Sequence, residues 1–185
     1  MNLEKSKIYL TFDDGPNEYT LKNLETLKNF NLKAIFFVVG KNCQKFPQVL
    51  KEIVKGGHSI GNHSFSHSIR FFFDFKREIE KTREIIKEIT GIETKIFRPP
   101  YGFLPFWLKN YLLENGYTIL LWNLDSKDWR GKVDQRISQK IKSDSILLFH
   151  DCLETSRTLP KILENLKREN FIFQEIINKI IAELK

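Results

Sequence analysis

The sequence predicts an α/β domain built on a parallel sheet, either a compressed (β/α) barrel or an open doubly wound sheet. Short apolar runs and amphipathic stretches alternate about seven times along the 185 residues, with no linker, repeat or low-complexity segment between them. Polar clusters follow five of the apolar runs, where parallel strands of both architectures carry their chemistry. A full eight-unit barrel needs about 250 residues, so a barrel here would be incomplete. We expect one domain over residues 1–185.

Seven short apolar segments have the character of strands that are buried on both faces of a sheet. In chain order they are KIYLTF (7–12), AIFFVVG (34–40), HSIGN (58–62), KIFRPP (95–100), YTILLWNLD (117–125), SILLFHD (145–151) and FIFQ (171–174). Because helical stretches separate them, we expect about seven parallel strands joined by helical crossovers.

The stretches between the strands carry apolar residues at helical spacing. These residues are Leu21, Leu24, Leu27 and Phe30, then Ile79, Thr82, Ile86 and Ile89, then Leu159, Ile162, Leu163 and Leu166, and finally Ile176, Ile177, Ile180 and Ile181. Glycines follow several of these stretches, at Gly56-Gly57, Gly91 and Gly116, where glycine commonly ends a helix. The pattern therefore predicts amphipathic helices that cover the sheet.

Charge and composition limit the classes of partner. The formal net charge is +7, which could favour an anionic partner such as nucleic acid, a cell-wall polymer or a lipid phosphate. The lysines are spread along the predicted helix faces and are not clustered with aromatic residues, so we expect no nucleic-acid partner. No apolar stretch reaches the roughly 18 to 20 residues of a membrane span, so we expect no transmembrane segment. The oligomeric state stays open.

The location of the protein is predicted only by default. The N-terminal stretch MNLEKSKIYL has no apolar segment of the secretory type, which favours a cytoplasmic protein. Cys43 and Cys152 are the only cysteines, too few for a disulfide framework and compatible with a reducing compartment.

Two adjacent carboxylates, Asp13 and Asp14, follow the first predicted strand in YLTFDDGPN. Like charges repel, so this pair needs either open water or a cation. His63 and His67 in NHSFSH are four residues apart, and their imidazoles share a side if the segment is helical or tightly turned. Two imidazoles and one carboxylate form the usual protein ligand set of a hydrolytic zinc site. Neighbouring side chains of an extended chain point to opposite sides, which favours one ligand and one base, but the spacing does not order them.

The remaining polar clusters contain the other groups that a metal hydrolase needs. His150 is the candidate general acid, and Asp128 could raise its pKa as a nearby opposite charge. Arg98 could pair with the base carboxylate and keep it ionised. The rigid RPP turn would present the backbone N–H of Tyr101 as an oxyanion donor.

Each of these residues also has an ordinary structural interpretation. Arg98 could form a surface ion pair, and Pro99-Pro100 could simply end a strand. Trp129 and Leu148 could be core residues. For His58, which follows the Gly-Gly turn, we expect a structural hydrogen bond and no catalytic role.

Five segments, TFDDGP, HSFSH, RPPYG, DSKDW and LLFHD, in this order, resemble the motifs of the polysaccharide deacetylase (NodB homology) domain, carbohydrate esterase family 4. The resemblance runs from about Tyr9 to about Ile176. It implies a distorted, compressed (β/α) barrel and metal-dependent removal of N- or O-acetyl groups from sugars. The roles that it implies are Asp13 as base, Asp14, His63 and His67 as metal ligands, Arg98 as the residue that orients the base, Tyr101 as oxyanion donor, Asp128 as partner of the acid His150, and Trp129, Leu148 and Pro100 as the substrate pocket.

The expected function is therefore removal of N-acetyl groups from the amino sugars of a polysaccharide or oligosaccharide, such as peptidoglycan or a chitin-like polymer. Zinc is the first choice for an Asp-His-His set, and cobalt, nickel or manganese also suit it. One alternative is a deacetylase or deformylase of a lipid-linked or small soluble sugar. Another is a non-catalytic carbohydrate-binding module, which would have little reason to keep the complete residue set.

Three features depart from the resemblance, and one of them is the segment DCLETSRT after His150, which lacks the glycines often found there. Many members of the family are secreted, whereas this chain shows no signal sequence. The segment HSIRFFFDFKRE is short and very aromatic, and its three consecutive phenylalanines, Phe71, Phe72 and Phe73, need burial or a partner. This segment follows the metal motif, so it borders the expected substrate groove.

Overall fold

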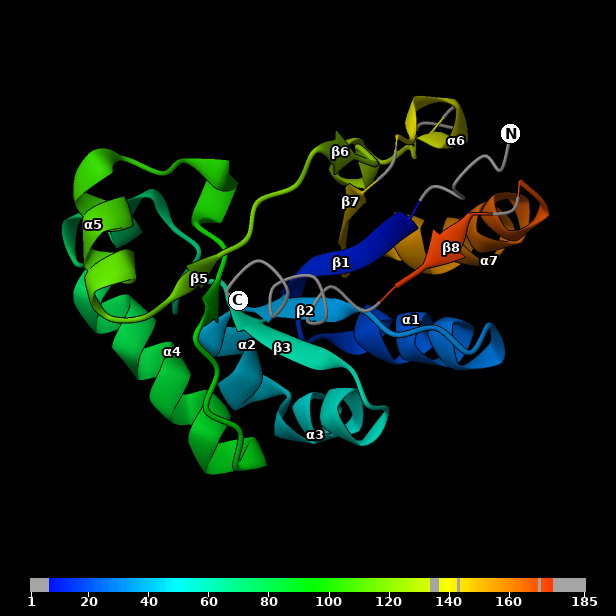
Figure 1. Cartoon of the computed structure of the whole chain (residues 1–185). Helices are drawn as coiled ribbons and strands as arrows, with labels where there is room; N and C mark the ends of the chain where they lie inside the picture. The colour runs from blue at the N-terminus through cyan, green and yellow to red at the C-terminus, as the bar shows by residue number, and fades with distance from the viewer. Residues whose placement is uncertain (1–6, 134–136, 143, 170, 175–185) are drawn as a thin grey trace.

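The computed structural model describes residues 7–133, 137–142, 144–169 and 171–174. Its strands form one parallel sheet with the order β5-β4-β3-β2-β1-β7-β6, and β8 also pairs with β1 (Figure 1). The strands are β1 (Lys7–Gly15), β2 (Ile35–Val38), β3 (Ser59–Asn62), β4 (Ile96–Phe97), β5 (Thr118–Ile119), β6 (Leu124–Asp125), β7 (Ser145–His150) and β8 (Ile172–Phe173). The predicted α/β class with a parallel, barrel-like sheet is confirmed.

Helices connect the strands and cover the sheet (Figure 1). They are α1 (Glu18–Asn29), α2 (Gly40–Lys45), α3 (Pro47–Lys55), α4 (Phe75–Thr90), α5 (Phe106–Glu114), α6 (Ile137–Lys140) and α7 (Leu153–Arg168). Three short 3₁₀ helices, Ile69–Phe73, Pro100–Gly102 and Asp128–Arg130, follow β3, β4 and β6. No helix in the described ranges combines the length and the apolar character needed to cross a bilayer.

The predicted strand over residues 117–125 is two strands, β5 and β6, which lie at the two ends of the sheet. The chain between them crosses from one end to the other. Two of its carbonyl oxygens bond to a buried side chain: Leu120 O accepts from Arg98 Nε at 2.9 Å, and Leu121 O accepts from an Arg98 terminal nitrogen at 3.3 Å. Among the described residues β5 and β6 do not pair, so the barrel is open there.

The core lies between the central strands and the helices, and its centre is aromatic. Phe12 of β1 stacks on Phe36 of β2 and on Phe149 of β7, with ring centroids 4.9 and 5.6 Å apart. The three side chains are fully buried, as expected for strands covered on both faces. Each buried phenylalanine contributes roughly 2–3 kcal/mol of transfer free energy, so these contacts fix the strands whose carboxyl ends carry the site.

The predicted helical stripes are confirmed in part. In α4 the buried face contains Ile79, Thr82 and Ile86, as the spacing predicts. In α1 the stripe is wrong at Leu21, which is 47% exposed, while Thr20 and Asn23 are fully buried. The reason is that both polar side chains bond to the buried carboxylate of Asp151. The predicted last helix, with Ile176, Ile177, Ile180 and Ile181, lies outside the described residues.

Candidate active site

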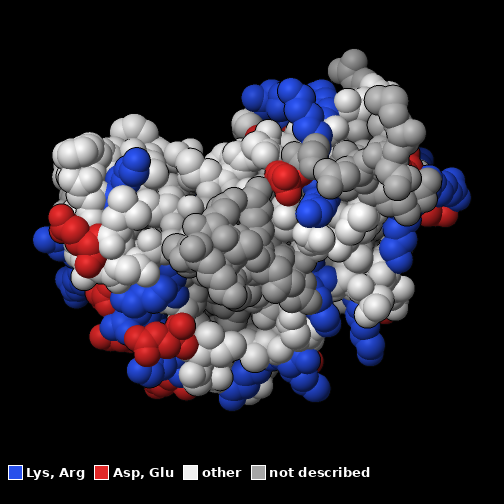
Figure 2. All heavy atoms as spheres, viewed as in Figure 1, with Lys and Arg blue, Asp and Glu red and all other residues white. Residues whose placement is uncertain are grey.

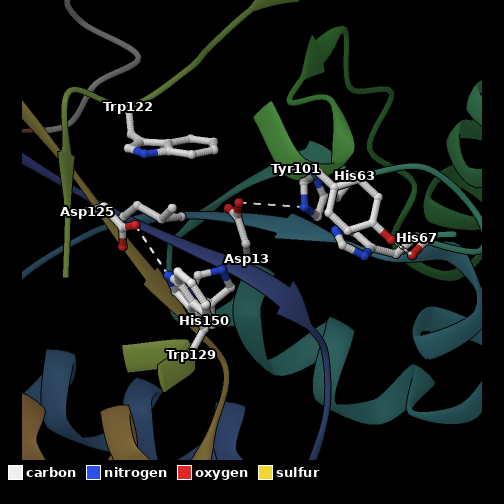
Figure 3. A pocket seen from close by; sticks show the side chains of 9 residues that line it. Asp13, His63, His67, Tyr101, Trp122, Asp125, Trp129 and His150 are labelled. Carbon is white, nitrogen blue, oxygen red and sulfur yellow. Dashed lines mark hydrogen bonds and ion pairs between the residues drawn. The ribbon is translucent and has the colours of Figure 1, made fainter. Parts of the chain in front are cut away.

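The carboxyl ends of β1, β6 and β7 and the loops after β3 and β4 surround one cavity of about 400 Å³ (Figure 3). This volume falls in the range of pockets that hold small ligands, about 300–1,000 Å³. The lining residues are Asp13, His63, His67, Tyr101, Trp122, Asp125, Trp129, Leu148 and His150. Most residues predicted for the site are therefore brought together, and the side chains of Arg98 and Asp128 lie buried behind the lining.

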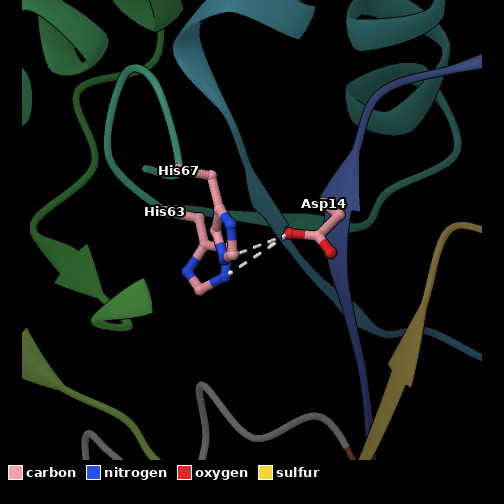
Figure 4. Close-up of side chains that lie close together, drawn as sticks. All are labelled: Asp14, His63 and His67. Atoms are coloured by element: carbon pink, nitrogen blue, oxygen red, sulfur yellow. Dashed lines mark ion pairs between the residues drawn. The ribbon is translucent and has the colours of Figure 1, made fainter. Parts of the chain in front are cut away.

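Asp14, His63 and His67 form a compact cluster of metal-ligand type (Figure 4). Their ligand atoms all lie within 4.8 Å of one another. Asp14 Oδ1 is 3.7 Å from His63 Nε2 and 3.5 Å from His67 Nε2. The same oxygen is buried and has no hydrogen-bond partner, which is costly for a carboxylate unless a cation binds it. The three residues therefore fit a divalent metal.

A left-handed backbone brings these ligands together. Asp14 has φ 68° and lies at an irregularity of β1, and His67 has φ 47°. Such a conformation costs a non-glycine residue roughly 1–2 kcal/mol. Because the backbone is not extended at Asp14, the two aspartate side chains do not point to opposite sides of the strand as we expected. Asp13 Oδ2 lies 3.6 Å from His63 Nε2, as close as Asp14 Oδ1 at 3.7 Å. A Cβ at Gly15 would collide with the carboxylate of Asp151, so glycine is required after the doublet.

The turn between the two histidines is held by short-range hydrogen bonds and is not helical. Ser64 N–H donates to Asn62 Oδ1 at 2.9 Å, and His67 N–H donates to Ser64 Oγ at 3.1 Å. Tyr101 O–H donates to the carbonyl oxygen of His67 at 3.0 Å. The imidazoles of His63 and His67 lie with centroids 4.7 Å apart, so they share a side through a tight turn.

His63 is prepared as a neutral ligand. Its Nδ1 donates to the carbonyl oxygen of Arg98 at 2.7 Å, because a carbonyl can only accept. Burial lowers the pKa of His63 to about 3, and the positive charges of His67 and Arg98 act in the same direction, against Asp14. The free Nε2 lone pair therefore faces Asp14. A backbone bond to the second ring nitrogen is the usual way in which proteins orient a metal-binding histidine.

Asp13 is held by a buried arginine. One terminal nitrogen of Arg98 donates to Asp13 Oδ1 at 2.7 Å and to Thr11 Oγ1 at 2.9 Å. Burial raises the pKa of Asp13, while the charges of Arg98 and His150 act in the opposite direction. Arg98 is fully buried and lies over the ring of Phe37 at 4.0 Å, so it is not a surface ion pair. Removing one partner of such a buried pair typically costs 3–5 kcal/mol.

His150 and Asp128 form a second pair, in which Asp128 is buried and His150 is partly exposed. His150 Nδ1 donates to Asp128 Oδ1 at 2.6 Å, and the His150 backbone N–H donates to Asp128 Oδ2 at 2.6 Å. Thr155 O–H also donates to Oδ2. Burial lowers the pKa of His150, but the bond and charge of Asp128, with the charges of Asp13 and Asp14, outweigh it and raise the pKa to about 9. The imidazole is therefore protonated at neutral pH.

The predicted pocket residues differ in exposure. Leu148 is buried at the floor of the cavity, and Trp129 is 56% exposed at its wall, so Trp129 is not a core residue. Arg130 lies 4.6 Å over the Trp129 ring. Tyr101 lines the cavity with φ 60°, and its ring packs on His67 at 4.8 Å. Pro100 is buried and is not among the lining residues.

Trp122 and Asp125 line the cavity but were not predicted. Trp122 lies on the segment that crosses between β5 and β6, and a Cβ at Gly102 would come within 2.7 Å of its ring. Gly102 therefore allows the indole to close that side of the cavity (Figure 3). Asp125 is the first residue of DSKDW and ends β6, and this position at a strand end was the available signal.

Two further predictions concern residues outside the cavity. His58 is buried, and its Nδ1 accepts from the Ala34 N–H at 3.3 Å, which confirms a structural role. Of the three phenylalanines, Phe71 is fully buried and Phe73 is 88% exposed. Phe72 packs against Phe103, with ring centroids 5.3 Å apart. Figure 2 shows that the upper surface over α5 is mostly uncharged, while acidic and basic side chains lie side by side over α4.

Comparison with known proteins identifies the family. The model of the polysaccharide deacetylase family matches residues 1–120. Two peptidoglycan-N-acetylglucosamine deacetylases of Bacillus cereus are 35% and 38% identical over 92% and 76% of this chain, which spans 69% and 53% of their lengths. The crystal structure of a polysaccharide deacetylase from the same organism has a TM-score of 0.84 and 34% identity over 93% of this chain and 92% of its own. A CE4 family pseudoenzyme from Bacillus anthracis has a TM-score of 0.87 and 26% identity, covering 95% of this chain and 65% of its own. This chain belongs to the polysaccharide deacetylase family.

Proposed function

We propose that this chain is a metal-dependent hydrolase that removes N-acetyl groups from the amino sugars of a polysaccharide or oligosaccharide. The observation that carries the proposal is one cavity that joins a metal-ligand cluster, a carboxylate held by arginine and a histidine held in its charged form. The names of the Bacillus cereus relatives support N-acetylglucosamine as the sugar.

Asp14, His63 and His67 would hold the metal, because they combine an unpaired buried carboxylate oxygen with two imidazoles. Zinc is the first choice for this ligand set, and cobalt, nickel or manganese also suit it. When bound, the metal supplies a Lewis acid that polarises the acetyl carbonyl and lowers the pKa of water. His63 needs no proton loss to act as a ligand, since burial already keeps it neutral.

Asp13 acts as the general base. Its Oδ1 is tied to Arg98, so Oδ2, which faces His63, is the oxygen that can take a proton from the attacking water. A raised pKa suits this role, because a base is most effective when its pKa approaches the working pH. Arg98 is the residue that orients the base, and its bonds to Thr11 and to the Leu120 carbonyl fix its own position.

His150 acts as the general acid. Its Nδ1–H is bonded to Asp128, which leaves the Nε2–H to protonate the nitrogen of the departing sugar amine as the C–N bond breaks. The Tyr101 backbone N–H would donate to the oxyanion that develops on the acetyl carbonyl. Leu148 and Trp129 would border the acetyl methyl group. Water and the amide thus yield acetate and a free amino sugar.

The alternative of a non-catalytic carbohydrate-binding module fits the site less well. A binding module gains nothing from burying the Arg98–Asp13 pair and the Asp128 carboxylate, because each buried ion carries a desolvation cost of several kcal/mol. The fold alone does not decide the matter, because one structural neighbour is described as a pseudoenzyme of this family. The argument for catalysis therefore rests on the residues of this chain.

The test is release of acetate and formate from a substrate panel, with and without a chelator. The panel contains chitooligosaccharides, peptidoglycan, acetylxylan and lipid-linked amino sugars. We expect acetate from the N-acetylglucosamine substrates, loss of activity on chelation, and recovery with zinc or cobalt. Release of formate alone, or from the lipid-linked sugar alone, would support the alternative substrate class. No release from any substrate by the zinc-loaded protein would support the binding module.

A further inference from the structure

One carboxylate of the cavity has no part in the chemistry proposed above. Asp125 ends β6, paired in register with Leu148 of β7, and its side chain lines the cavity. In Figure 3 it lies on the side of Asp13 opposite to His63 and His67. It is therefore separate from the metal-ligand cluster and faces whatever occupies the cavity.

Two neutral donors fix the Asp125 carboxylate. The backbone N–H of Lys127 donates to Oδ1 at 2.7 Å, and the indole Nε1–H of Trp129 donates to Oδ2 at 3.3 Å. Lys127 has φ 60°, a left-handed conformation that an ordinary turn residue avoids. The carboxylate is thus oriented at both oxygens. An ionised carboxylate accepts about four hydrogen bonds, so about two acceptor positions stay available to a ligand.

The charge of Asp125 is not balanced, unlike that of its neighbours. Asp13 is paired with Arg98 at 2.7 Å, and Asp128 is paired with His150 at 2.6 Å. Within the described parts of the chain, Asp125 forms no ion pair. It is therefore the carboxylate whose negative charge a substrate in the cavity meets directly.

We propose that Asp125 is a specificity-determining residue that accepts hydrogen bonds from sugar hydroxyl groups and selects neutral amino sugars over those that carry a carboxylate. The inference rests on the proposed function, because it assumes that an N-acetylated sugar occupies the cavity. N-acetylglucosamine units are neutral and rich in hydroxyl groups. N-acetylmuramic acid units carry a lactyl carboxylate, which Asp125 would repel in the low dielectric of a partly closed cavity.

The test compares the wild type with Asp125→Asn, which keeps the shape and removes the charge. The first readout is kcat and KM for acetate release from chitotetraose. The second is the position of acetyl loss in peptide-free glycan strands that contain both sugars, read by mass spectrometry. We expect the variant to raise KM for chitotetraose about tenfold, since a charge-assisted hydrogen bond is lost, with a smaller change in kcat. We also expect the preference for N-acetylglucosamine over N-acetylmuramic acid to fall about tenfold.

Two further variants separate substrate recognition from a purely structural role. Asp74→Asn makes the same chemical change at an exposed position outside the cavity lining, and we expect neither KM nor preference to change. Trp129→Phe removes the indole N–H but keeps an aromatic ring and the charge of Asp125. We therefore expect Trp129→Phe to retain the preference for the neutral sugar. If Asp125→Asn and Trp129→Phe lower activity equally and neither changes the preference, Asp125 only positions Trp129 and the inference is overturned.

A binding measurement distinguishes this inference from the proposed function. In zinc-loaded Asp13→Asn protein, calorimetry gives Kd for chitotetraose and for the peptide-free strands without turnover. Adding Asp125→Asn should weaken binding of chitotetraose about tenfold and narrow the difference between the two ligands. Unchanged Kd values would overturn the inference even if acetate release is normal. If the wild type releases no acetate but binding still depends on Asp125, the proposed hydrolysis is overturned and the inference stands.

Discussion

Replacing Asp128 with asparagine should move the alkaline limit of activity. Asp128 accepts hydrogen bonds from the ring and from the backbone N–H of His150, and its hydrogen bond and then its charge are the main influences that raise the histidine pKa against the effect of burial. Asparagine keeps the shape of the side chain and removes the charge. His150 should then lose its proton at a lower pH, and the proposed general acid should disappear with it.

The size of this effect follows from the pKa of His150, which is about 9. At pH 8 an imidazole with that pKa is about 90% protonated, whereas one at the ordinary pKa of about 6.5 is about 3% protonated. The loss of the acid form alone therefore lowers the rate about 30-fold at pH 8 in Asp128→Asn. Near pH 5.5 both proteins are mostly protonated, so this part of the difference should vanish.

The assay is kcat/KM for acetate release between pH 5.5 and 9.5, with metal content measured on the same preparations. In the wild type the alkaline limb should lie near pH 9, and in the variant near pH 6.5. Metal content should be equal, because Asp128 does not belong to the cluster of Asp14, His63 and His67. An alkaline limb that stays near pH 9 in the variant would refute the role of Asp128, and loss of metal would refute the division of the site into acid and ligands.

Two other predictions concern the carboxylates of Asp13, Asp14 and Asp151. Asp13→Asn should keep its metal and lose turnover about 100-fold or more, whereas Asp14→Asn should bind the metal more weakly and regain part of its activity in excess zinc. Elemental analysis and kcat are measured for both variants. Loss of metal from Asp13→Asn but not from Asp14→Asn would exchange the two roles. Burial raises the pKa of Asp151 to about 7, although Thr20 and Asn23 bond to it. The carboxyl is thus neutral in the fold at a pH where it ionises in the unfolded chain, so its contribution to the free energy of unfolding is full below about pH 4 and is lost as the pH rises through about 7. The free energy of unfolding of Asp151→Asn, measured in urea relative to that of the wild type, should therefore rise by roughly 3–4 kcal/mol from pH 4 to pH 8. A difference between the two proteins that does not vary with pH would contradict this.

The sequence predicted the fold where it depends on local pattern and missed it where tertiary contacts decide. Apolar runs and helical spacing located the strands and the major helices within the described residues. The break between β5 and β6 was not predictable, because it depends on the hydrogen bonds that Arg98 donates to the carbonyl oxygens of Leu120 and Leu121. The buried face of α1 was mispredicted at Leu21 because Thr20 and Asn23 bond to a carboxylate far away in sequence.

The candidate site was predictable because its residues stand at strand ends and match five motifs. The protonation states of these residues were harder to predict from the sequence. His63 owes its lowered pKa to burial, and His150 owes its raised pKa to Asp128. Trp122 gave no signal at all, since it reaches the cavity only through the crossing segment.

The central claim is that acetate release depends on one metal held by Asp14, His63 and His67, and titration of the metal-free protein with zinc tests it most directly. Bound zinc and initial rate of acetate release from chitotetraose are measured on the same samples. We predict that the rate rises in proportion to bound zinc and stops rising at one zinc per chain. Full activity in the metal-free protein, or no acetate release at one zinc per chain, would contradict the account.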